Sequence, residues 1–151
     1  MKKSMMAILM SLALVAVGIA PVMAQSGTDT TTLVAGGSSG SINSSAAFTA
    51  GASSKITGTI TAVAAVTLGA EASVTGNVTA GAAFTSGANS TVGGSVNAGA
   101  DFTSGANSVI AGNVSVTGSI TLGAGSKILG AVHTGTGVIV YGRDATVGSI
   151  N

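Results

Sequence analysis

The groups that could perform acid–base or metal chemistry are few in this 151-residue chain. Glu71 and Asp101 differ by 30 positions, and His133 is the only histidine. A hydrolase or transferase holds an acid, a base or a nucleophile within hydrogen-bond reach of one another, and the sequence predicts no such set. The absence of cysteine excludes disulfides and thiolate metal sites. We therefore expect no enzymatic activity, no catalytic residue, no cofactor and no bound metal.

The polar residues that repeat are threonine, asparagine and serine, at intervals of 18 positions. One set is a single column formed by Thr49, Thr67, Thr85, Thr103 and Thr121. The other is a two-column strip, with Thr59, Asn77, Ser95 and Asn113 beside Thr61, Thr79, Asn97 and Ser115. His133 continues the second column of the strip, which indicates a solvated side chain rather than a catalytic base. Such residues either simply suit exposed strands and turns, or they form a hydroxyl array that matches an ordered surface such as ice.

The apolar residues keep the same interval and indicate which elements position the polar sets. Three apolar columns recur, with a glycine column between two of them. The first column contains Phe48, Val66, Phe84, Phe102, Ile120 and Val138; the second contains Ile56, Val74, Val92, Ile110 and Ile128; the third contains Ile42, Ile60, Val78, Val96, Val114, Val132 and Ile150. The glycines are Gly40, Gly58, Gly76, Gly94, Gly112, Gly130 and Gly148. A short fixed period without a helical pattern is typical of a solenoid, in which each repeat forms one coil.

We predict an all-β fold, a single-stranded β-helix with 18-residue coils and about six to seven turns. Alternation around each apolar position predicts roughly three short strands per coil. A hexapeptide β-helix requires aliphatic residues in a column that here contains Ser54, Ala72, Ser90, Ser108 and Ser126. This column favours a right-handed, triangular β-helix, although columns alone leave the handedness open. Thr146 takes the phase of Ile128 and displaces Val147 by one, which predicts an irregular last coil.

The N-terminal region has the layout of a secretory signal peptide. Lys2 and Lys3 precede an apolar run from Met5 to Ala20, and small residues follow up to Ala24. A retained membrane anchor is the alternative, but the run is shorter than the roughly 20 residues that span a bilayer. We expect residues 1–24 to be a cleaved signal peptide, 25–37 a polar lead-in that is flexible or caps the first coil, and 38–151 the β-solenoid. The protein is then secreted, in the extracellular space, at the cell surface or in the periplasm, without a stable membrane span.

Charged residues are sparse. The full chain has a net charge of +1, and residues 25–151 contain three basic and four acidic residues, a net charge of −1. Nucleic-acid binding depends on the neutralisation of phosphates by basic residues. Nucleic acid is therefore not an expected partner.

The C-terminal coil has no recognisable cap. Solenoids normally finish in a segment with a polar outer face, whereas this coil contains Val147 and Ile150. An uncapped coil exposes unpaired backbone groups, which are a template for pairing with another copy. Low surface charge removes a common defence against such pairing. We predict end-to-end assembly into a homopolymer, with Val147 and Ile150 at the assembly end.

Two known families resemble parts of the repeat. The segments GNVTAG (76–81), GSVNAG (94–99) and GNVSV (112–116) resemble the Gly-Asn-Ile-x-Ala rung of bactofilins, and the resemblance covers residues 40–151. It implies a right-handed β-helix that polymerises end to end without nucleotide. The segment SITLGAGSKILGAV (119–132) is similar to the C-terminal coils of the secreted ice-binding β-helix family. The favoured interpretation is a secreted, self-assembling surface or matrix protein, and the alternative is an ice-binding protein that uses a flat face of Thr, Asn and Ser.

Overall fold

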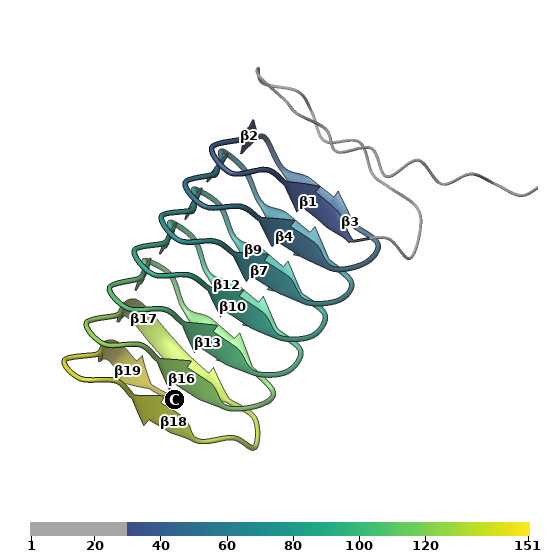
Figure 1. Cartoon of the computed structure of the whole chain (residues 1–151). Coiled ribbons are helices and arrows are strands. Elements are labelled where there is room, and N and C mark those ends of the chain that lie inside the picture. The colour runs from purple at the N-terminus through teal and green to yellow at the C-terminus, as the bar shows by residue number, and fades with distance from the viewer. Residues whose placement is uncertain (1–29) are drawn as a thin grey trace, which may run out of the picture.

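The computed structural model describes residues 30–151, which form a parallel β-solenoid without a helix (Figure 1). Its strands stack into three ladders, one for each side of the coil, and one ladder contains seven strands. The prediction of an all-β solenoid with about 18 residues per coil is thus confirmed. The expected signal peptide at residues 1–24 lies outside the described residues. Within residues 30–151, no helix is long and apolar enough to cross a membrane.

The first ladder forms one flat sheet of seven strands. Its strands are β1 (Thr31–Leu33), β4 (Phe48–Ala50), β7 (Val66–Leu68), β10 (Phe84–Ser86), β13 (Phe102–Ser104), β16 (Ile120–Leu122) and β18 (Ile139–Tyr141). All neighbours in this sheet are parallel, and Phe84 pairs with Phe102 exactly one coil further on. In Figure 1 these strands follow one another along the front of the solenoid.

The other two ladders are joined into a single sheet by one long strand, β17 (Lys127–Thr134). The second ladder contains β2 (Ser38–Ser39), β5 (Lys55–Ile56), β8 (Ser73–Val74), β11 (Thr91–Val92) and β14 (Val109–Ile110). The third contains β3 (Ile42–Ser44), β6 (Ile60–Ala62), β9 (Val78–Ala80), β12 (Val96–Ala98) and β15 (Val114–Val116). The last strand, β19 (Thr146–Ile150), pairs with β17.

The apolar columns form the core between the three ladders. Phe84 and Phe102 are fully buried, and their rings stack with centroids 5.2 Å apart and planes at 14°. Such an aromatic pair adds about 0.5–1.5 kcal/mol beyond the burial of its area. The three phenylalanines therefore belong to the core, where the columns predicted them.

Each coil turns one corner through a residue in the left-handed conformation. These residues are Gly36, Ser53, Glu71, Asn89, Asn107, Gly125 and Asp144, with φ between 55° and 68°. The next position in most coils is a buried serine, and Ser90 Oγ donates a hydrogen bond to the carbonyl oxygen of Gly87 at 2.8 Å. Ser108 and Ser126 repeat this bond with Gly105 and Gly123. The serine column that interrupts the hexads is therefore part of the corner, where its hydroxyls satisfy turn carbonyls.

The last coil contains one extra residue, so the sequence assignment of Val138 to the first core column is wrong. Ile139 pairs with Ile120, whereas the Val138 side chain is 65% exposed. The shift persists to Val147, which pairs with Ile128, and the register returns to 18 where Ile150 pairs with Val132. The predicted irregularity of this coil is confirmed by the register shift along β17.

The first coil begins within the segment that the sequence assigned to the lead-in. Strand β1 pairs with β4, with Thr31 opposite Phe48, and Leu33 is buried. The Gly36 N–H also donates to the carbonyl oxygen of Ala52. Residues 31–36 are therefore integrated into the first coil of the solenoid.

Candidate functional site

The threonine column lies along the centre of the seven-stranded sheet. Each threonine occupies the middle of its three-residue strand, and both of its neighbours in the strand are buried. The outward row consists of Thr32, Thr49, Thr67, Thr85, Thr103 and Thr121, and it ends at Val140. We call this row the threonine ladder. The sequence columns missed Thr32 because the first coil is one residue shorter, and Val140 because the last coil is one residue longer.

The hydroxyl groups of the threonine ladder make no hydrogen bonds within the described part of the protein. Neighbouring parallel strands lie about 4.8 Å apart, so hydroxyl and methyl groups recur at this spacing along the face. Small residues flank the ladder, with Ala65 and Ala83 on one side and Gly69 and Gly87 on the other. The face is consequently flat, uncharged over its first four coils, and free to bind an external partner.

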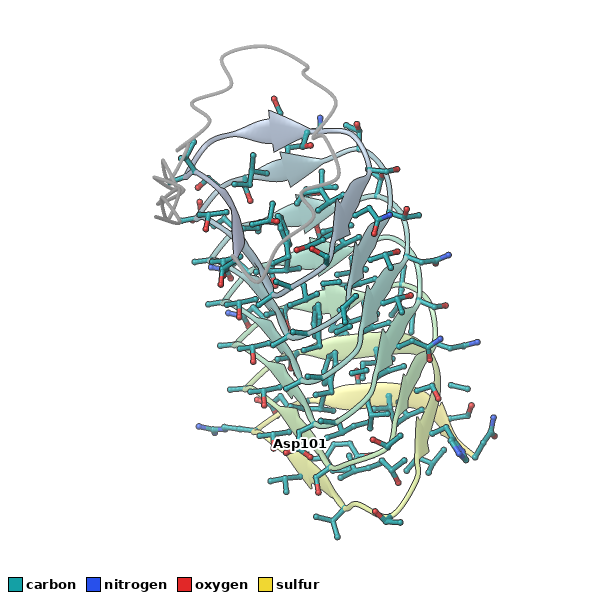
Figure 2. The ribbon with its side chains drawn as sticks, turned by 90° about the vertical axis from the view of Figure 1, so that its right-hand side faces the viewer. Asp101 is labelled. Carbon is teal, nitrogen blue, oxygen red and sulfur yellow. The ribbon has the colours of Figure 1, made fainter. Side chains whose placement is uncertain are left out.

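Asp101 interrupts the row of small residues beside the ladder; Figure 2 labels it among the side chains of the stacked coils. Its Oδ1 accepts a hydrogen bond from the Ser119 N–H at 2.8 Å. Ser119 Oγ in turn accepts a hydrogen bond from the Val138 N–H at 3.3 Å. The carboxylate therefore has a structural contact with the next coil.

The first column of the two-column strip is a structural ladder. Asn77 Oδ1 accepts a hydrogen bond from the Ser95 N–H at 2.8 Å, and Ser95 Oγ accepts one from the Asn113 N–H at 3.0 Å. Asn113 Oδ1 accepts from the Ala131 N–H at 2.8 Å. The side-chain oxygen of each coil thus satisfies a backbone donor of the next. These oxygens are occupied within the protein, a role that residue type and spacing did not reveal.

The second column of the strip follows the outward centre of the third ladder. Thr61, Thr79, Asn97, Ser115 and His133 are adjacent in this order. A shallow depression runs over the last four of them. His133 Nδ1 lies 3.1 Å from the carbonyl oxygen of Asn151, so the ring contacts the backbone of the last coil. The strip as a whole is less regular than the threonine ladder, because its second column changes from Thr to Asn, Ser and His.

The two acidic residues considered for catalysis lie at different places on the coil. Glu71 is at a left-handed corner, where its Oε2 accepts a hydrogen bond from Ser53 Oγ at 2.9 Å. Asp101 precedes β13 on another side of the coil. Among residues 30–151, no group of three or more His, Asp or Glu side chains is arranged to hold a metal ion.

The C-terminal coil exposes side chains that are buried in the coils before it. Ile150 is 60% exposed although its partner Val132 is fully buried, and Tyr141 is 45% exposed although its partner Leu122 is buried. Val147, the other residue expected at the assembly end, is partly buried against the core. We call the surface formed by Ile139, Tyr141, Val147 and Ile150 the C-terminal end face.

Comparison of the chain with protein-family models, with curated proteins and with solved structures finds no match.

Proposed function

We propose that this protein is a secreted, non-enzymatic structural β-solenoid that associates with itself through the C-terminal end face. The observation that carries the proposal is the exposure of Tyr141 and Ile150 in columns whose other members are buried. Burial of one such side chain contributes about 1.5–3 kcal/mol. Contact with another copy would supply the apolar neighbours that earlier coils receive from the next coil.

The backbone of this coil supports the same proposal. Strand β18 pairs with β16 along one edge, and among the described residues its other edge has no strand partner. An unpaired edge presents donors and acceptors that another strand can satisfy. The bactofilin-like segments of the sequence are consistent with assembly through coil ends.

Self-association is tested by sedimentation and electron microscopy of the protein and of the variant Ile150→Arg. We expect the arginine to weaken association by about tenfold or more, because a charge buried without a partner costs more than 1.4 kcal/mol. Val63→Arg is the matched control, since Val63 is 69% exposed and lies away from the end face. A protein that stays monomeric at high concentration, or equal effects of the two variants, contradicts the proposal.

Ice binding is a second candidate function, and the free hydroxyls of the threonine ladder favour it. Their regular spacing on a flat face supports contact with an ordered array of water molecules. The Asn77 column of the strip supports it less, because its oxygens accept backbone hydrogen bonds. A thermal-hysteresis and ice-shaping assay tests this function, and absence of both effects in the wild-type protein excludes it.

A further inference from the structure

The two ends of the solenoid differ in the exposure of their core side chains. In the first coil, Leu33 is 5% exposed and Ile42 is 2% exposed. In the last coil, the residues of the same two columns are Tyr141 and Ile150, at 45% and 60%. Apolar surface of the core columns is therefore available at the C-terminal end face and not at the first coil.

We propose that two copies pair through their C-terminal end faces around a two-fold axis, with strand β18 antiparallel to β18 of the partner subunit. This inference rests on the proposed self-association and specifies its partner and geometry. A contact of one surface with itself is isologous and closes at two copies, whereas a filament needs two different complementary ends. The exposure of only one end favours the closed pair.

The sequence of β18 is suited to this arrangement. With the axis at Val140, Ile139 lies opposite Tyr141 of the partner subunit, and both residues belong to core columns. The two cores thus become continuous across the contact. Val140, which is 50% exposed, lies opposite its own copy on the outer face, at the position where the threonine ladder ends in an apolar residue.

Charge does not oppose the pairing. Residues 139–151 contain one basic residue, Arg143, and one acidic residue, Asp144. Arg143 Nε lies 3.7 Å from Asp144 Oδ2. The end face consequently carries no net charge, and two copies approach without electrostatic repulsion.

Disulfide trapping tests the geometry, and the natural chain has no cysteine that would interfere. Directly opposite residues of antiparallel strands have Cα atoms about 4.5–5.5 Å apart, a separation that a disulfide spans. Val140→Cys should therefore double in mass on oxidation. Thr85→Cys, an exposed residue of the same row in the middle of the solenoid, should remain monomeric under denaturing conditions.

A mixture of Val140→Cys with Thr32→Cys separates the alternatives. Head-to-tail stacking would join Val140 to Thr32 and leave Val140→Cys alone uncrosslinked, which overturns the two-fold pair but keeps self-association. Association of the wild-type protein with neither crosslink also overturns the inference. A wild-type monomer in sedimentation overturns the proposed function itself.

Discussion

The backbone N–H of Gly94 donates a hydrogen bond to the carbonyl oxygen of Gly76 at 3.2 Å. Residues one period apart in the sequence are therefore neighbours in space, and their backbones approach closely at this column. A Cβ atom on Gly94 would lie 2.7 Å from the same carbonyl oxygen. This contact is too short for any side chain, so the column is restricted to glycine by the stacking of the coils.

Gly94→Ala should lower the free energy of unfolding by about 1–3 kcal/mol, because the new methyl group forces the backbones apart. Gly40→Ala is the matched control in the same column, since no atom lies within 4 Å of its added Cβ. Urea denaturation of both variants measures the difference. Equal stability of the two variants would contradict close stacking at Gly94.

Asn113→Ala should cost about 1 kcal/mol of stability, because the Ala131 N–H loses the acceptor that Asn113 Oδ1 provides at 2.8 Å. Asn97 is exposed in the neighbouring column and has no such bond in the described part of the chain. Asn97→Ala should therefore change stability by less than about 0.5 kcal/mol. Thermal unfolding of the pair tests the structural role of the first column, which would be refuted by the reverse order.

Two buried serines should respond to alanine in opposite directions. Ser86 Oγ is buried without a hydrogen-bond partner, whereas Ser90 Oγ donates to Gly87 at 2.8 Å. Ser86→Ala should stabilise the protein by about 1 kcal/mol, because it removes a polar group that burial leaves unsatisfied. Ser90→Ala should destabilise it by a similar amount. Chemical denaturation gives both values, and a loss of stability in Ser86→Ala would show that its hydroxyl is satisfied.

The two candidate ice-binding faces are distinguished by one charge on each. Thr85→Lys places a charge at the centre of the threonine ladder, and Thr79→Lys places one in the second column of the strip. We expect thermal hysteresis to fall strongly in Thr85→Lys and to remain near wild type in Thr79→Lys. Circular dichroism controls for folding of both variants. The opposite result would assign ice binding to the strip.

The sequence predicted the ladders well because one interval governs the chain from Phe48 to Ile128. It misplaced Val138 because one inserted residue in an irregular turn changes the phase without changing the residue types. It missed Thr32 for the same reason at the other end. The role of Asn77 was not predictable, because an outward amide that bonds the next coil has the same spacing as one that faces solvent. Residue columns therefore predict which positions share a side, but not which polar atoms remain free.

The register of the first ladder is constant from β4 to β16, at 18 residues between paired positions. Removal of residues 66–83 would join Ala65 directly to Phe84, in the phase that Val66 occupies. The shortened protein would keep both of its terminal coils and lose one central coil. Duplication or loss of a gene segment that encodes a single coil is thus a route by which such a molecule changes its length while its ends stay the same.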